Sequence, residues 1–139
     1  MGQQQLLLII LGVIVVGIAV AVGITMFNDS AVSANRDAVT NDLVNLASRA
    51  QQYYRRPTAL GGGGGSFLNL ATDGMKLITK TSGSSMINGN GTYTIVSATA
   101  TTIQFQGLGT ETGNTPPGKV KVVMDVWADS AKVDNTQTN

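Results

Sequence analysis

The stretch Leu6–Phe27, LLLIILGVIVVGIAVAVGITMF, decides the fold of this 139-residue chain. It contains no charged residue and no proline, and its strongest polar group is the hydroxyl of Thr25. As an α-helix that rises about 1.5 Å per residue, the stretch is long enough to cross the roughly 30 Å hydrocarbon core of a bilayer. The other residues are too few and too polar to bury such a helix on all sides. The sequence therefore predicts a membrane helix.

A cleaved signal peptide is the alternative interpretation of this segment. Ala19, Val20 and Ala21 match the small-x-small cleavage pattern. However, no Lys or Arg precedes the apolar run, and the run continues past that site. We therefore expect the helix to be retained.

Small residues interrupt the apolar run at Gly12, Gly17 and Gly23. Gly17 with Ala21, and Ala19 with Gly23, form small-xxx-small pairs, which allow helices to approach closely in an apolar medium. Alternatively, these glycines only reflect the higher frequency of glycine in membrane helices. The sequence leaves both interpretations open.

Composition argues against several classes of function. Nine Lys and Arg balance eight Asp and Glu, so neither nucleic acid nor an acidic substrate is indicated as a partner. The absence of Cys rules out disulfides and thiol chemistry, and the absence of His removes the commonest general base and metal ligand. We also find no convergent carboxylates, Ser-Lys pair or cofactor motif. We expect no enzyme, no metal site and no cofactor.

After Asn28 the sequence turns amphipathic without a helix breaker. Neither Gly nor Pro occurs between Asn28 and Arg56, and Pro57 disfavours helix at the residue before it. We expect one helix from about Gln3 to Arg55, roughly 75 Å long. The apolar positions that repeat with helical spacing are Val32, Val39, Leu43, Leu46, Ala50 and Tyr53.

The segment that follows contains five consecutive glycines within Pro57–Ser66. We interpret it as a flexible connector, because a phosphate-binding loop would need a Lys-Ser/Thr ending or a preceding strand. Ser66–Lys80 is ambiguous between helix and strand, and Thr81–Gly91 consists of turn-forming residues.

Alternating apolar residues then predict three strands, at about 92–98, 101–107 and 119–127. Gly107–Gly118 is expected to be a loop, because Pro116 and Pro117 are incompatible with a central strand. Asp129–Asn139 is expected to be a frayed polar tail. The residues predicted to face the core from the strands are Tyr93, Ile95, Ile103, Phe105, Val120, Val122, Met124 and Val126.

The predicted fold class is α+β, with a long N-terminal helix and a small antiparallel sheet packed on its C-terminal half. We divide the chain into an apolar anchor, residues 1–28, and a head, residues 29–139. Within the head we expect an amphipathic helix at 29–56, a Gly-rich loop at 57–66, a sheet at about 75–127 and a polar tail at 128–139.

This layout resembles that of the type IV pilins. Residues 3–27 correspond to the anchor part of the pilin helix, residues 31–57 to the rest of that helix, and TYTIVS, TTIQFQG and KVKVVMDVW to the sheet. The resemblance covers the whole chain. It implies a structural subunit that sits in the inner membrane before assembly and then polymerises through its apolar helix into an extracellular filament.

The family's assembly site maps onto the start of the chain with departures. Pilins carry a glutamate near the beginning of the mature helix; Gln5 stands there if Met1 is the mature N-terminus, and Leu7 if processing follows Gly2. A basic leader is missing, so we expect either a mature sequence or another export route. The family's proline is replaced by Val22 and Gly23. The residues to which the resemblance and the packing pattern assign assembly are Gln5, Leu6, Leu7, Gly12, Gly17, Ala21 and Gly23.

The resemblance also implies partners, namely copies of the chain itself, an assembly platform and ATPase of the inner membrane, a prepilin peptidase and membrane lipid. Two alternatives stay open: a pseudopilin of a type II-like secretion system, and a monomeric single-pass protein with an outward binding domain. Asn28 and Asn90 begin N-x-S/T triplets and are candidate glycosylation sites.

Overall fold

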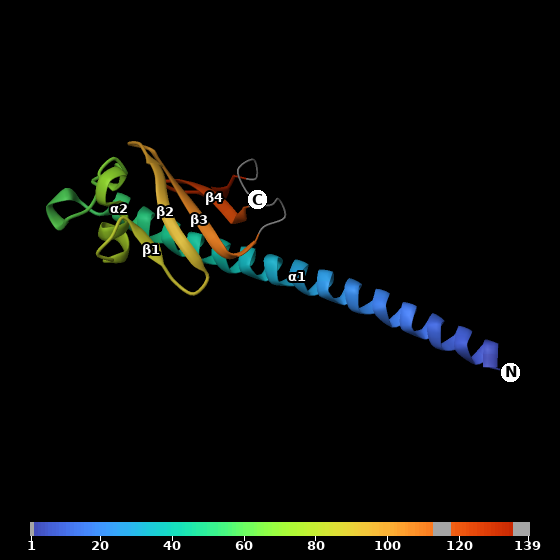
Figure 1. Ribbon diagram of the computed structural model, residues 1–139. Helices are drawn as coiled ribbons and strands as arrows, with labels where there is room; N and C mark the ends of the chain where they lie inside the picture. The colour runs from blue at the N-terminus through green and yellow to red at the C-terminus, as the bar shows by residue number, and fades with distance from the viewer. Residues whose placement is uncertain (1, 113–117, 135–139) are drawn as a thin grey trace.

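The computed structural model describes residues 2–112 and 118–134 and shows a rod that enters a small head (Figure 1). The rod is α1 (Gly2–Arg55), a single helix whose first half projects alone and whose second half lies under the head. No proline interrupts it, so every turn can keep its backbone hydrogen bonds. The predicted continuous helix from about Gln3 to Arg55 is confirmed.

The head contains a five-stranded antiparallel sheet in which each strand pairs with the next along the chain. The strands are β1 (Ser85–Ile87), β2 (Gly91–Ala98), β3 (Thr102–Thr112), β4 (Lys119–Trp127) and β5 (Ala131–Val133). β3 and β4 lie on the second half of α1, so the predicted α+β arrangement is confirmed.

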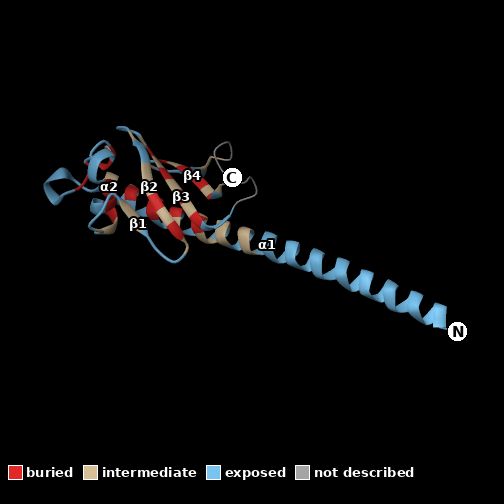
Figure 2. Ribbon diagram, viewed as in Figure 1, coloured by how far each residue is buried: buried red, intermediate tan, exposed pale blue. Residues whose placement is uncertain are grey.

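The core forms between α1 and the inner face of the sheet (Figure 2). Of the predicted helix stripe, Val32 is half-buried at the edge of the head and the other members are buried. The predicted strand residues meet this stripe, with Ile95 half-buried and the rest buried. The apolar spacing of the sequence therefore identifies both layers of the core.

The ambiguous segment 66–80 holds α2 (Leu70–Thr79), which packs on β2 and α1. Leu70, Met75 and Ile78 are its buried apolar residues. Gly74 is also buried, and a Cβ there would overlap the Ile95 side chain, so α2 lies close against the sheet. The sheet accordingly spans residues 85–133 and does not begin at about 75.

Three strand segments lie where we expected turns, loop and tail. β1 falls within the predicted turn region and pairs Met86 with Tyr93, and β5 falls within the predicted tail and pairs Val133 with Met124. β3 extends to Thr112, well past the predicted loop start at Gly107. The predicted loop prolines and the end of the tail lie outside the described residues.

Glycines make the β3 extension possible because α1 crosses the strand closely there. Gly107 and Gly109 are buried and alternate with outward residues. A Cβ on Gly107 would lie 2.5 Å from Cγ1 of Val39, and one on Gly109 would overlap the Asn35 side chain. The helix can therefore rest on the sheet only where these positions lack a side chain.

The glycine run is not the flexible connector that we predicted but an ordered cap on the C-terminus of α1. It follows the short 3₁₀ helix η1 (Thr58–Leu60). The backbone N–H of Gly63 donates to the Tyr53 carbonyl over 2.8 Å, that of Gly64 to Arg56 over 2.9 Å and that of Gly65 to Tyr54 over 2.8 Å. These bonds satisfy carbonyl groups that the end of a helix otherwise leaves unpaired.

Candidate membrane and assembly surfaces

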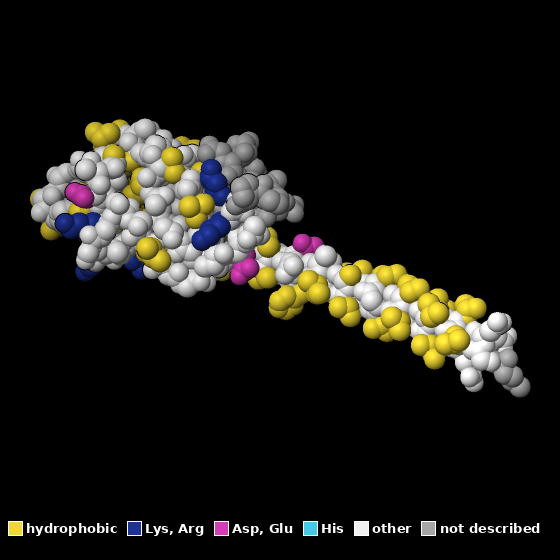
Figure 3. Space-filling view, viewed as in Figure 1, with side chains coloured by type: hydrophobic (Ala, Val, Ile, Leu, Met, Phe, Trp, Pro, Cys, Tyr) yellow, Lys and Arg dark blue, Asp and Glu magenta, His cyan; other side chains and the backbone are white. Residues whose placement is uncertain are grey.

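The first half of α1 is an apolar surface that the chain does not cover. Residues 2–30 are all exposed, and Leu7 and Phe27 have exposed fractions of 69% and 74%. Figure 3 shows these apolar side chains around the rod, in contrast to the mixed surface of the head. Among the described residues, α1 is the one helix whose length and composition allow it to span a membrane. A lipid bilayer or other protein chains must therefore cover residues 6–27 in water.

The residues predicted for assembly lie on this projecting part of α1. Gln5, Leu6, Leu7, Gly12, Gly17, Ala21 and Gly23 are all exposed, and Gly2, the possible processing site, begins the helix. A Cβ on any of the three apolar-run glycines would meet nothing within 4 Å. The folded chain itself therefore gives no packing reason for glycine at these positions.

The small residues of the rod form two strips on opposite sides. At about 100° per residue, Gly12, Ala19 and Gly23 share one side of the helix. Gly17 and Ala21 lie on a second side, roughly 160° away around the axis. Each strip lowers the helix surface enough for a neighbouring helix to approach closely.

A polar cluster around Asp42 joins α1 to the sheet. Oδ2 of Asp42 accepts hydrogen bonds from Tyr93 Oη at 2.6 Å, Asn88 Nδ2 at 2.8 Å and Asn90 Nδ2 at 2.9 Å. Burial alone would raise the pKa of Asp42, but the hydrogen bonds from Asn90, Tyr93 and Asn88 together lower it below 3.8. Burial and the neighbouring Asp42 carboxylate raise the pKa of Tyr93, so its hydroxyl stays a donor.

Asn90, one of the two candidate glycosylation sites, belongs to this cluster. Nδ2 of Asn90, the atom that would carry a glycan, donates to Asp42, and the Asn90 carbonyl accepts from Asn35 Nδ2 at 3.0 Å. Asn28 is exposed in the middle of α1. A glycan on Asn90 would therefore have to break a contact that links the β1–β2 turn to α1.

Hydrogen bonds also fix the far end of α1 to the β4–β5 turn. Gln51 Nε2 donates to the Trp127 carbonyl at 3.1 Å and to the Ser130 carbonyl at 3.2 Å. Arg55 donates to the Ala128 carbonyl at 3.3 Å. Together with the Asp42 cluster near the middle of the covered part, these bonds hold α1 to the head.

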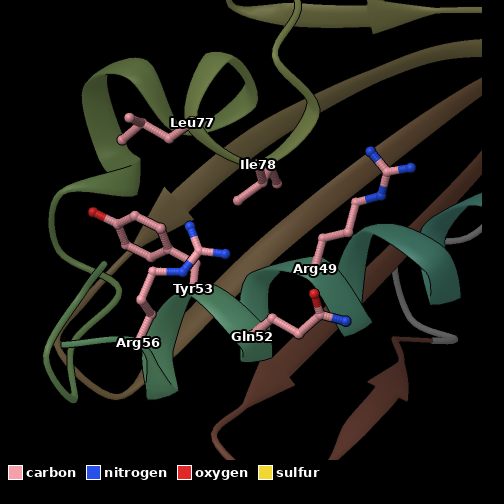
Figure 4. A pocket seen from close by; sticks show the side chains of 6 residues that line it. All are labelled: Arg49, Gln52, Tyr53, Arg56, Leu77 and Ile78. Atoms are coloured by element: carbon pink, nitrogen blue, oxygen red, sulfur yellow. The ribbon is translucent and has the colours of Figure 1, made fainter. Parts of the chain in front are cut away.

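A hollow of about 220 Å³ opens between the last turns of α1 and α2 (Figure 4). Arg49 and Gln52 lie on α1 and Arg56 directly follows it, and Leu77 and Ile78 lie across from them on α2. The ring of Tyr53 also lines the hollow. The hollow combines two guanidinium groups with an apolar wall. This combination is suited to binding a carboxylate that lies next to apolar groups.

Neither the role of Asp42 nor this hollow is predicted from the sequence. Tyr93 at a predicted inward position was the available sign of a polar partner, because buried tyrosine hydroxyls usually find one. The hollow joins residues from two helices that the glycine cap brings together, and no local pattern marks it.

Among residues 2–112 and 118–134, no group of three or more Cys, His, Asp and Glu side chains is arranged to hold a metal ion. No protein-family model, curated protein or solved structure matches the chain. Its function must therefore be argued from its own residues.

Proposed function

We propose that the chain is a structural subunit of a type IV pilus-like filament, held in the membrane by the first half of α1 and polymerised through that same half. The observation that carries the proposal is the uncovered apolar helix of residues 6–27, continuous with a helix that is fixed to a folded head. The pilin-like layout of the sequence supports it, because pilins combine these same two parts.

Polymerisation needs little hydrophobic driving force in this arrangement. Lipid and a bundle of identical helices are both apolar, so moving the rod from one to the other changes the hydrophobic free energy little. Close packing and contacts between heads then decide the balance. The two strips of small residues on opposite sides of the rod let each helix pack between two neighbours.

The chain would depend on other proteins for the work of assembly. Its glycine run lacks the Lys-Ser/Thr ending of a nucleotide-binding loop, and its backbone N–H groups already cap α1. By the pilin resemblance, an ATPase and a platform protein of the inner membrane would supply that work, and a prepilin peptidase would process the N-terminus. The filament would then lie outside the cell.

The proposal is tested by substituting one small residue of the rod in cells that assemble the protein. Gly17→Leu keeps the rod apolar, so the protein should still enter the membrane, but the added side chain blocks close approach of a neighbouring helix. We expect negative-stain microscopy of sheared surface material to show labelled filaments for the wild type and few or none for Gly17→Leu. The matched control, Val22→Leu, adds bulk at a position roughly 60° or more around the helix from both strips and should assemble.

Other outcomes favour the alternatives. Stable detergent monomers and no fibres from wild-type cells would indicate a monomeric membrane-anchored binding domain. Short periplasmic assemblies without surface fibres would indicate a pseudopilin. Normal filaments from Gly17→Leu would contradict the helix packing proposed here.

A further inference from the structure

Two hollows lined by described residues lie at opposite ends of the covered part of α1. The distal pocket is the hollow lined by Arg49, Gln52, Tyr53, Arg56, Leu77 and Ile78. The neck hollow, of about 280 Å³, lies where the rod enters the head and is lined by Asp29, Val32, Ser33 and Arg36. The distal pocket offers two guanidinium groups, whereas the neck hollow offers the carboxylate of Asp29 beside the guanidinium group of Arg36. Asp29 is therefore the group of the neck hollow that is complementary in charge to the distal pocket.

Within residues 2–112 and 118–134, the side chains that would form this contact have no partner in their own chain. Asp29 is exposed, and its carboxylate makes no hydrogen bond or ion pair with the described residues. Arg49 and Arg56 are also exposed, and their guanidinium groups make no such contact with the described part of the chain. By contrast, Arg36, the other charged residue of the neck hollow, already has an interaction.

The two hollows cannot meet inside one molecule. α1 is one continuous helix, so Arg49 and Arg56 lie roughly 30 and 40 Å along its axis from Asp29. Contact between the hollows therefore requires two copies of the chain.

Their directions around the helix also suit repeated contact. At about 100° per residue, Arg49 and Arg56 lie roughly 180–200° around α1 from Asp29. A subunit can thus offer its neck hollow to one neighbour and its distal pocket to another. Such a heterologous contact does not satisfy itself in a pair and continues from copy to copy.

Basic side chains gather at the distal end more widely. Figure 3 shows carboxylates where the rod joins the head, with Lys and Arg side chains at the far end and over the head. The basic residues of segments 49–56 and 70–80 are Arg49, Arg55, Arg56, Lys76 and Lys80, and the carboxylate of these segments is that of Asp73. An incoming carboxylate therefore meets a positive field.

We infer that the distal pocket of one copy receives Asp29 of a second, parallel copy that is displaced along the helix axis by roughly 30–40 Å. The inference rests on the proposed filament and adds which surfaces of the heads meet. The paired guanidinium groups hold the carboxylate, and Tyr53, Leu77 and Ile78 exclude water around it, which strengthens the attraction.

Cross-linking tests the contact directly, because the chain has no cysteine of its own. Filaments of the double variant Asp29→Cys/Arg56→Cys are treated with a short bis-maleimide and analysed on a denaturing gel. We expect a ladder of covalent multimers, because each copy joins two neighbours. Either single variant should give dimers at most, and a bridge within one chain would have to span roughly 40 Å.

The matched control places the second cysteine on another exposed carboxylate of α1. Asp37 lies roughly 100° around the helix from Arg56, so Asp37→Cys/Arg56→Cys should give no ladder. Filaments of the Asp29 double variant without a ladder would overturn the inference, as would an equal ladder from the Asp37 control.

Exchanging the charges of the two sides gives an independent test of the contact. Arg49→Glu with Arg56→Glu places like charges across the contact and should lower filament yield about tenfold or more. Adding Asp29→Arg should restore the yield to within about threefold, whereas adding Asp37→Arg should not. Thermal melts of the detergent-solubilised chains verify that each variant is folded.

The outcomes separate the inference from the proposed function. If the wild-type chain forms no filaments, both are wrong. If filaments form but the arginine variants assemble normally, or Asp29→Arg fails to restore assembly, the contact alone is wrong.

Discussion

At the scale of single residues, Asp42 shows how one carboxylate can orient a helix on a sheet. It lies on the covered half of α1 and is half-buried, and its three donors come from the β1–β2 turn and from β2. Tyr93 is fully buried, so its hydroxyl has no water to bond if the carboxylate is removed. The cluster therefore fixes the position of α1 along the sheet, which apolar packing alone specifies less strictly.

The first prediction concerns Asp42→Asn and its dependence on pH. The folded-state pKa lies below 3.8, so the carboxylate stabilises the fold above about pH 4 and loses this contribution as the pH falls through the folded-state pKa. We expect the variant to be less stable than the wild type by roughly 1–3 kcal/mol at pH 7 and the difference to shrink below pH 4. Thermal melts of the detergent-solubilised chain between pH 2 and 7 measure this.

Asp37→Asn serves as the control, because Asp37 is exposed on the same helix and its side chain makes no hydrogen bond or ion pair with the described residues. It should follow the wild type across the pH range. A constant difference between Asp42→Asn and the wild type down to pH 2 would show that the charge of Asp42 contributes nothing.

At the scale of elements, the glycine cap explains how a helix as long as α1 ends without fraying. Gly62 and Gly63 are buried against the last turn, and Gly65 has a φ of +88°, which other residues rarely adopt. The cap also carries the chain toward α2, whose Leu77 and Ile78 line the distal pocket. Its glycines are therefore required by close approach and backbone conformation, and flexibility is not their role.

The second prediction is that Gly63→Ala destabilises the head. A Cβ there would overlap the Ser66 carbonyl oxygen and lie 2.9 Å from Cε1 of Tyr53. We expect a loss of roughly 1–3 kcal/mol in the free energy of unfolding, measured by thermal or chemical denaturation. Gly89→Ala is the matched control, because a Cβ at Gly89 meets nothing within 4 Å and its φ is not positive. Equal stability of the two variants would indicate that the run is a loose connector after all.

The same elements show what the sequence could predict. The helix stripe from Val39 to Tyr53 and the alternation in β4 depend on side chains, and side-chain periodicity is visible in a sequence. The predicted strand at about 101–107 is shorter than β3 because Gly107 and Gly109 occupy inward positions without a side chain. The alternation of apolar and polar residues is therefore not visible in the sequence where the helix comes closest. β1 and β5 have three residues each, too few for a period of two to appear.

The glycine cap and the distal pocket were missed for a related reason. The cap is made by backbone N–H groups, which carry no residue-specific pattern. The pocket unites Arg49 and Leu77, which are far apart in the chain and meet only after the cap has reversed its direction. By contrast, the exposed rod follows from composition alone, because no other part of the chain is apolar enough to cover it.

At the scale of the whole molecule, the structure divides into two parts. The rod requires an apolar environment, whereas the head has its own buried core. The rod has its apolar side chains on the outside, whereas the head has a buried apolar core that begins at Val39. The core cluster contains no residue before Val39, and Val32 is the earliest residue packed against it. The head should therefore fold without the rod, and the rod should determine only where the head is placed.

The last prediction follows from this division. Removing residues 1–28 should give a soluble monomer, because the apolar stripe of the residual helix is already covered by the sheet and α2. Its thermal midpoint in aqueous buffer should lie within about 5 °C of that of the full chain in detergent, which corresponds to roughly 1 kcal/mol for a domain of this size. Size-exclusion chromatography and circular dichroism measure both properties.

A truncation that retains the rod but shortens the head tests the same division, because it should change the stability of the head and not the membrane affinity of the rod. Removing residues 131–139 deletes β5 and should lower the midpoint, because β4 then loses a paired strand. The chain should still partition into detergent, because residues 6–27 are intact. If instead the chain without residues 1–28 aggregates or melts without a cooperative transition, the rod contributes to folding of the head and the boundary near residue 28 is wrong.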